Sequence, residues 1–167
     1  MISFEEARAQ ILDNIQTAQR VRVRLEKLLG HVLGEPVIAN YDLPHFDNSA
    51  VDGFAVCLTD LNAATSNGAF ELPVIGEIRA GDAPPLPLSA GCAYKIFTGA
   101  PVPEGTQAVV MKEHCQDLSG SVKINHRPQA GEHIRRRGEE FLRGKEILPE
   151  GMRITPAIVG LLASLGQ

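Results

Sequence analysis

The sequence predicts an α+β protein, with a compact antiparallel β-barrel-like domain inserted into an elongated helix-plus-hairpin lobe formed by both termini. Three observations support this: helical spacing of apolar residues near both ends, short β-prone runs between them, and turn residues separating those runs. The 16 glycines and 11 prolines agree with a chain rich in turns. We therefore expect residues 1–44 and 134–167 to form one lobe and residues 45–133 to form the β domain.

The first predicted helix begins after Ser3, an N-cap residue. Glu6 lies three residues further on and completes a capping box with Ser3. Apolar residues then recur at helical spacing, at Phe4, Ala7, Ile11 and Ile15.

Two further helices are expected. Residues 25–33 place leucine and valine side chains on one face, and Gly34 follows directly. Residues 21–24, just before, alternate as in a short strand. Near the C-terminus, Thr155 is followed by proline, a combination typical of a helix start, and Gly166 is expected to end that helix.

The central region predicts strands separated by turns such as Asn67-Gly68. A hairpin between residues 146–148 and 152–154 is expected around a Pro-Glu-Gly turn. The five β-prone runs are residues 51–58, 72–80, 92–97, 108–115 and 121–126.

Composition excludes several classes of function. A net charge of −4 and few aromatic residues argue against a nucleic-acid-binding protein. No apolar run approaches the roughly 18–20 residues that span a bilayer, and the N-terminus has no secretory signal pattern. The three cysteines include no CxxC pair. We therefore expect a cytoplasmic protein without a membrane partner.

The segment from Asp42 to Ala55 concentrates polar groups just before a predicted buried strand. Asp52 stands beside apolar residues, and a desolvated carboxylate needs a cation, an N–H array or an arginine as partner. Asp47, Asn48 and Ser49 also fit a simpler explanation, a loop in which they bond to the local backbone.

Two other segments are candidates for ligand binding. Thr98 and Gly99 follow a predicted strand, where a hydroxyl and an accessible backbone suit an anion, although the pattern by itself favours a rigid proline-braced turn. Residues 135–137 are consecutive arginines; one or two can face a phosphate, or all can form salt bridges between domains.

These three motifs, in this order, resemble the N-terminal region of molybdopterin molybdenumtransferase, the MoeA/gephyrin E-domain family. The similar stretches are Asp42 to Ala55, Thr98 to Gly105 with residues 108–111, and Ile134 to Glu139. The resemblance covers essentially the whole chain but less than half of a typical family member.

The resemblance implies a function and site residues. The family inserts molybdate into adenylylated molybdopterin with Mg²⁺ and releases AMP, in molybdenum cofactor biosynthesis. Asp52 and Thr98 match residues implicated in activity, and the two side chains are expected to converge on one exposed ledge. The expected roles are Mg²⁺ binding for Asp52 and orientation of an anionic oxygen for Thr98. Asp47, Asn48, Ser49, Gly99, Arg136 and Arg137 are the expected substrate-binding residues.

The resemblance also implies partners. We expect a homodimer whose site is completed by a molybdopterin-binding domain, possible contact with molybdopterin adenylyltransferase, and no turnover by the 167 residues alone. The alternative is a non-catalytic scaffold or dimerisation module of the gephyrin type.

Overall fold

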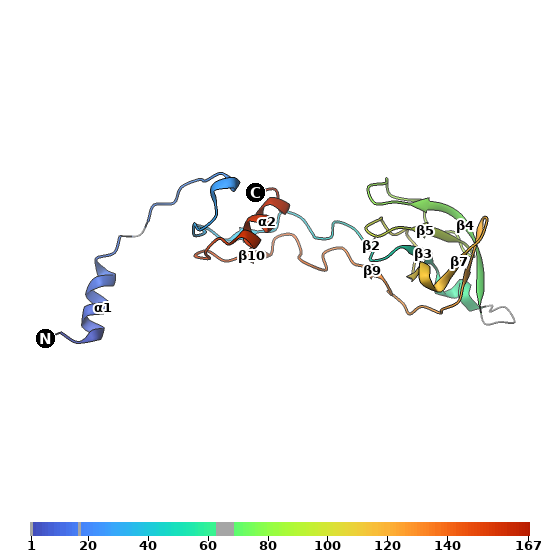
Figure 1. Cartoon of the computed structure of the whole chain (residues 1–167), viewed down its shortest axis with the longest axis horizontal. Coiled ribbons are helices and arrows are strands. Elements are labelled where there is room, and N and C mark those ends of the chain that lie inside the picture. The colour runs from blue at the N-terminus through green and yellow to red at the C-terminus, as the bar shows by residue number, and fades with distance from the viewer. Residues whose placement is uncertain (1, 17, 63–68) are drawn as a thin grey trace. The chain divides into compact units, whose positions relative to one another are not determined.

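The computed structural model describes residues 2–16, 18–62 and 69–167. The chain divides into two compact units, Met1–Ile38 with Glu146–Gln167, and Ala39–Lys145. The described residues are mostly β-strands among the regular elements, with two α-helices (Figure 1). The domain boundaries expected from the sequence, at residues 44 and 134, stay a prediction.

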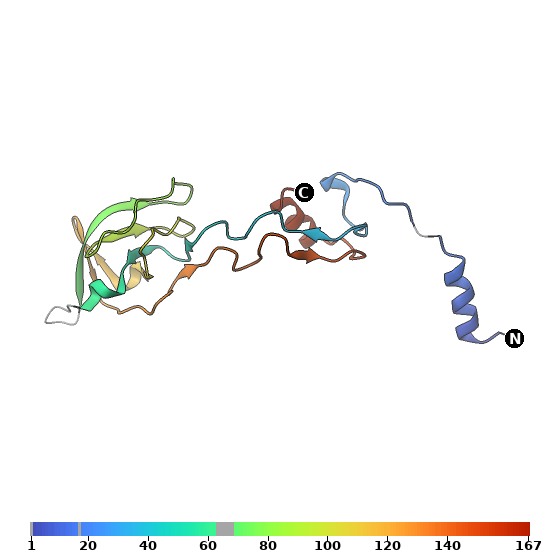
Figure 2. The same ribbon diagram turned by 180° about the vertical axis from the view of Figure 1, so that it is seen from behind.

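The larger unit is built on a six-stranded sheet with the strand order β6-β3-β5-β4-β8-β7. The long strand β4 curls, and the sheet forms a half-barrel (Figure 2). Each of the five β-prone runs overlaps a strand, as predicted, although residues 112–114 of the run 108–115 form a 3₁₀ helix that separates β6 from β7. The strands are β3 (Gly53–Val56), β4 (Phe70–Ile78), β5 (Ala93–Ile96), β6 (Ala108–Met111), β7 (Cys115–Asp117) and β8 (Ser121–Ile124).

The expectation of an antiparallel sheet is wrong at one pair of strands. β4 and β5 run parallel, with Val74 opposite Ala93 and Ile78 opposite Ile96. Parallel neighbours need a connection of about a dozen residues or more, and residues 79–92 supply it. The sheet is therefore mixed.

Strand β3 lies in the interior of the unit, and all four of its residues are buried. Because successive side chains point to opposite faces, Phe54 and Val56 pack into one apolar cluster, and Ala55 packs into another. Because β3 is buried on both faces, its position in the unit is well defined. Asp52 directly precedes this strand.

A separate two-stranded pairing in the same unit joins distant parts of the sequence. β2 (Asn48–Ser49) pairs antiparallel with β9 (Ile134–Arg135), with Ser49 opposite Ile134. This pairing brings the first polar motif beside the arginine run.

The smaller unit contains both α-helices. α1 (Phe4–Asp13) has the predicted capping box between Ser3 and Glu6, and none of its residues is buried. α2 (Pro156–Ser164) begins after Thr155, whose side chain accepts a hydrogen bond from the Ile158 N–H, as predicted. No helix among the described residues is long and apolar enough to cross a membrane.

Three predictions for the smaller unit are wrong: the helix over residues 25–33, the strand over residues 21–24, and the hairpin between residues 146–148 and 152–154. Residues 25–33 hold only a short 3₁₀ helix, η1 (Leu25–Lys27), and residues 21–24 form no strand. The backbone N–H groups of Gly30 and Leu33 instead donate to the carbonyls of Ile154 and Met152. These backbone pairings satisfy groups that a continued helix would use internally.

The predicted hairpin is wrong for the same reason. β10 (Glu146–Leu148) pairs with β1 (Val37–Ile38), and residues 152–154 pair with residues 31–33. Both arms of the expected hairpin therefore bind an earlier segment rather than each other. The Asn67-Gly68 turn lies outside the described residues.

Candidate functional site

The candidate site begins where the chain enters β3. At Gly53 an added Cβ would lie 1.9 Å from the Val110 carbonyl oxygen, so β3 and β6 approach too closely for any side chain at this position. The glycine thus fixes the backbone next to Asp52, and the antiparallel β3–β5 register, with Gly53 opposite Ile96, directs the chain after β5 toward Asp52.

Asp52 and Thr98 meet, as the sequence motifs predicted. Asp52 Oδ1 accepts hydrogen bonds from the Thr98 backbone N–H at 3.0 Å and from the Thr98 hydroxyl at 2.9 Å. The Asp52 side chain keeps 37 % of its surface exposed, so the pair lies on an accessible rim.

Lys112 completes the surroundings of this carboxylate. Its Nζ lies 3.2 Å from Asp52 Oδ2, and its backbone N–H donates to the Asp52 carbonyl at 3.0 Å. The Thr98 backbone N–H, then the Thr98 hydroxyl and the Lys112 ammonium, hold the pKa of Asp52 below its ordinary value. Asp52 is therefore a carboxylate at neutral pH.

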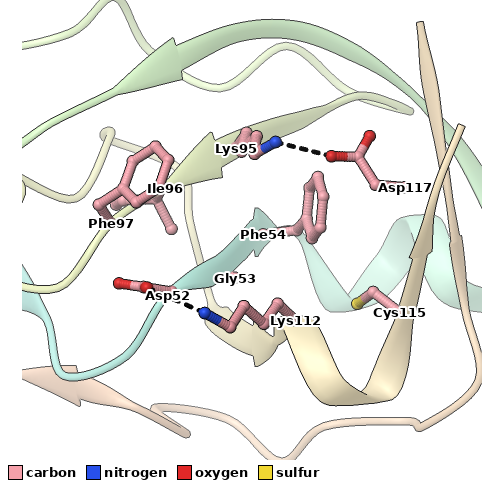
Figure 3. Close-up of a pocket in the computed structure, with 9 residues that line it drawn as sticks. All are labelled: Asp52, Gly53, Phe54, Lys95, Ile96, Phe97, Lys112, Cys115 and Asp117. Atoms are coloured by element: carbon pink, nitrogen blue, oxygen red, sulfur yellow. Dashed lines mark hydrogen bonds and ion pairs between the residues drawn. The ribbon is translucent and has the colours of Figure 1, made fainter. Parts of the chain in front are cut away.

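Asp52 and Lys112 line a pocket of about 380 Å³ that also contains a second ion pair. Lys95 Nζ lies 2.7 Å from Asp117 Oδ2, and this contact raises the pKa of Lys95. Figure 3 shows the two ion pairs at separate places on the wall, with Phe54 between them in this view. The other lining residues are Gly53, Ile96, Phe97 and Cys115.

The pocket offers no reactive thiol. Burial, followed by the nearby carboxylates of Asp117 and Glu113, raises the pKa of Cys115 to about 12. Because the thiolate is the nucleophilic form, Cys115 is chemically inert at neutral pH and acts as a small apolar wall residue.

The other predicted site residues form a second cluster that does not line this pocket. Arg136 Nη1 lies 2.6 Å from Asp47 Oδ2, and the Arg137 backbone N–H donates to Asp47 Oδ1 at 2.8 Å. Arg137 Nε also pairs with Asp42 Oδ2 at 2.7 Å. Both arginines are thus engaged by carboxylates of the same unit, and their role toward a ligand stays a prediction.

Asn48, Ser49 and Gly99 connect the two groups through backbone contacts. Asn48 and Ser49 are buried, and the Ser49 hydroxyl donates to the Val51 carbonyl at 2.6 Å. The Gly99 N–H donates to the Ser49 carbonyl at 2.8 Å. These hydrogen bonds stabilise the backbone on either side of Asp52 and Thr98. Ligand contact by Asn48, Ser49 and Gly99 stays a prediction.

Lys95, Lys112 and Asp117 were not among the residues predicted for the site. Lys112 directly follows strand β6, and Gly53 pairs with Met111, so the register alone places Lys112 beside Asp52. That register depends on a pairing between segments nearly sixty residues apart, which no local pattern specifies.

The described residues do not fit a magnesium site built by this chain alone. Across residues 2–16, 18–62 and 69–167, no group of three His, Cys, Asp or Glu side chains is placed to hold a metal ion. Asp52 is a single carboxylate, and both of its oxygens already accept hydrogen bonds. Mg²⁺ usually takes one or two carboxylates, with waters and substrate oxygens filling an octahedron.

Comparison with known proteins gives consistent matches. The model of the MoeA N-terminal region (domain I and II) matches residues 2–166. Molybdopterin molybdenumtransferase 2 of Mycobacterium tuberculosis is 40 % identical over 166 residues, covering 99 % of this chain and 41 % of that protein. The molybdopterin molybdenumtransferase of Staphylococcus aureus is 36 % identical over 165 residues, covering 99 % of this chain and 39 % of its own length.

A solved structure matches over the same extent. The molybdopterin biosynthesis moeA protein of Pyrococcus horikoshii OT3 superposes with a TM-score of 0.91 at 31 % identity, over 99 % of this chain and 44 % of that one. The chain spans about two fifths of the length of the curated relatives it matches. With its sequence motifs, its fold and these matches in agreement, the chain belongs to the family of the MoeA N-terminal region.

Proposed function

We propose that this chain is the N-terminal part of a molybdopterin molybdenumtransferase, which inserts molybdate into adenylylated molybdopterin and releases AMP in molybdenum cofactor biosynthesis. The family match and the relatives' names support the reaction class. The single observation that carries a role for this chain is the exposed Asp52–Thr98 pair on the pocket rim. In this proposal the rim is one wall of an inter-subunit active site in a cytoplasmic homodimer.

The hydrogen-bond directions define what each rim residue offers. The Thr98 hydroxyl has one proton and donates it to Asp52, so it presents lone pairs to a ligand rather than a donor. Asp52 remains an anionic acceptor for a ligand N–H or O–H. The positive groups that meet an anionic oxygen are therefore the ammonium groups of Lys112 and Lys95, a different assignment from the one expected for Thr98.

The 167 residues alone are proposed to lack turnover. The four charged side chains of the pocket are two lysines and two aspartates, and their charges cancel. A substrate with several negative charges needs further positive or N–H groups, which a molybdopterin-binding domain would supply; molybdopterin adenylyltransferase is the proposed source of adenylylated substrate. Magnesium on Asp52 stays a prediction, and no step is assigned to it, because the carboxylate is already engaged.

A second function, a non-catalytic scaffold or dimerisation module, is favoured by one observation. Helix α1 has no buried residue, and it exposes Phe4, Ile11 and Leu12, with exposed Ile15 just beyond its end. Large apolar side chains gathered on one helix face are typical of a surface that another protein covers.

Complementation distinguishes the two functions. The chain is added in trans to a family enzyme that lacks this region, as wild type, as Asp52→Asn and as Asp82→Asn, and molybdate insertion is measured. Asp82 is an exposed carboxylate in a turn of the same unit, so its variant controls for loss of a charge. Restoration by wild type and Asp82→Asn but not by Asp52→Asn supports the catalytic wall. Equal restoration by all three chains supports the scaffold.

A further inference from the structure

We propose that Lys112 is the built-in counter-ion of Asp52: it holds the position beside the carboxylate where a divalent cation would bind, and this chain presents an ammonium group there instead. The inference rests on the proposed role of Asp52 in the rim. Its test measures cation binding by this chain alone, so the inference can fail while the proposed function stands.

The first argument is the occupancy of the carboxylate. Oδ1 accepts two hydrogen bonds from Thr98, and Oδ2 faces the Lys112 ammonium at 3.2 Å. A cation bound to Oδ2 would have to displace Lys112 or lie against its positive charge.

The second argument is the backbone that places Lys112. β6 ends at Met111, and Lys112 begins the short helix η3 (Lys112–His114). The Lys112 N–H donates to the Asp52 carbonyl at 3.0 Å, so both the backbone and the side-chain ammonium of Lys112 contact Asp52. The contact therefore follows from the sheet register and does not depend on a freely moving side chain alone.

The third argument is the lack of other ligands near the carboxylate. The second aspartate of the pocket, Asp117, is paired with Lys95 at 2.7 Å. Among the residues that line this pocket, none is a histidine or a third carboxylate. A divalent cation at Asp52 would meet a single carboxylate with the Lys112 ammonium already beside it, an unfavourable balance of charge.

The consequence is a measurable competition. A unit charge about 4 Å from a dication in water changes its binding free energy enough to alter the affinity by roughly tenfold or more. Replacing Lys112 by a neutral residue should therefore increase cation affinity at Asp52 by about tenfold. Lys112 has 60 % of its side chain exposed, so the replacement should leave the fold intact.

The test is a titration of the ¹⁵N-labelled 167-residue chain with MnCl₂, following paramagnetic broadening of the Gly53 and Thr98 amide signals. Lys112→Gln and Lys112→Met should broaden at about one tenth of the wild-type Mn²⁺ concentration, and Lys112→Arg should behave as wild type. MgCl₂ should reverse the broadening. The double variant Asp52→Asn with Lys112→Gln should lose the gain.

Lys95→Gln is the matched control, because it removes a lysine of the same pocket that pairs with Asp117 and not with Asp52. If Lys95→Gln increased the Mn²⁺ affinity read at the Thr98 amide as much as Lys112→Gln does, the effect would be one of general charge, and the proposal would be overturned. Equal Mn²⁺ affinity of wild type and Lys112→Gln would also overturn it, as would broadening of the wild type at micromolar Mn²⁺ centred on Asp52.

Discussion

Gly53 is the residue on which the geometry of the rim depends most directly. It lies between Asp52 and the buried Phe54, where an added Cβ would lie 1.9 Å from the Val110 carbonyl oxygen of β6. Any side chain here would collide with the backbone of Val110 and not with a flexible group. The Asp-Gly pair therefore has two separate physical roles, a charged acceptor and a close strand contact.

Gly53→Ala should destabilise the larger unit by about 3 kcal/mol, because the added methyl group forces β3 and β6 apart. Urea unfolding followed by circular dichroism measures the change. Gly160→Ala is the matched control: its Cβ has no heavy atom within 4 Å, and it lies inside helix α2. That variant should gain about 0.5–1 kcal/mol in helix stability. Equal stability of Gly53→Ala and wild type would contradict the close contact.

Individual residues also show how far the motifs were informative. The convergence of Asp52 and Thr98 was predicted and is confirmed in the structure. The assignment of Lys112 was not possible from local pattern, because it depends on which residue of β6 pairs with Gly53. A shift of one residue in that register would turn the lysine away from the carboxylate.

At the scale of elements, the pairing of β2 with β9 is supported by a network of carboxylates and arginines. Asp42 accepts a hydrogen bond from the Arg143 backbone N–H at 2.8 Å and from the Arg137 side chain at 2.7 Å. The Arg143 N–H first, then Arg137, lower the pKa of Asp42. The arginine run thus forms salt bridges within one unit, whereas the sequence interpretation placed such salt bridges between domains.

This network predicts a pH dependence of stability. Because the pKa of Asp42 is lower in the folded state than its unfolded value of about 3.9, the unfolded chain takes up the proton first. The stabilisation is present above about pH 4 and is lost as the pH falls through the lower folded value.

Asp42→Asn should flatten the fall in melting temperature between pH 5 and pH 3 relative to wild type. Thermal unfolding followed by circular dichroism in that range is the measurement. Asp13→Asn, at the end of α1, controls for removal of a carboxylate elsewhere. An unchanged acid slope in Asp42→Asn would show that the network does not contribute.

The helices show which elements local sequence specifies. α1 and α2 form as predicted, since capping side chains at Ser3 and Thr155 satisfy N–H groups within a few residues of themselves. Residues 25–33 have equally good helical spacing and fail, because their backbone pairs with residues 152–154. A long-range partner overrides a local preference there.

At the scale of the whole molecule, the exposed apolar face of α1 is a surface that another protein would be expected to cover. Ile11 is 63 % exposed and Phe4 is 78 % exposed, in a helix with no buried residue. Burying these side chains would gain about 25 cal/mol for each Å² removed from water. A second copy of the chain is the partner in the proposed homodimer.

Ile11→Glu should convert the proposed dimer to a monomer, because a charge placed in an apolar interface is not solvated there. Sedimentation velocity at several protein concentrations measures the oligomeric state. Gln10→Glu adds the same charge elsewhere around the same helix and should leave the dimer intact. A wild-type chain that sediments as a monomer throughout would contradict the homodimer.

Local patterns and specific motifs were enough to predict the capped helices, the β-rich middle of the chain, the family and the meeting of Asp52 with Thr98. These features depend on residues close in sequence or on motifs long enough to be specific. Three features became clear from the folded chain alone: the parallel β4–β5 pair, the partners of residues 30–33 and 146–154, and the counter-ion of Asp52. Each of these depends on strand pairing over long sequence distances, where many registers satisfy the same local preferences and only packing of the whole unit selects one.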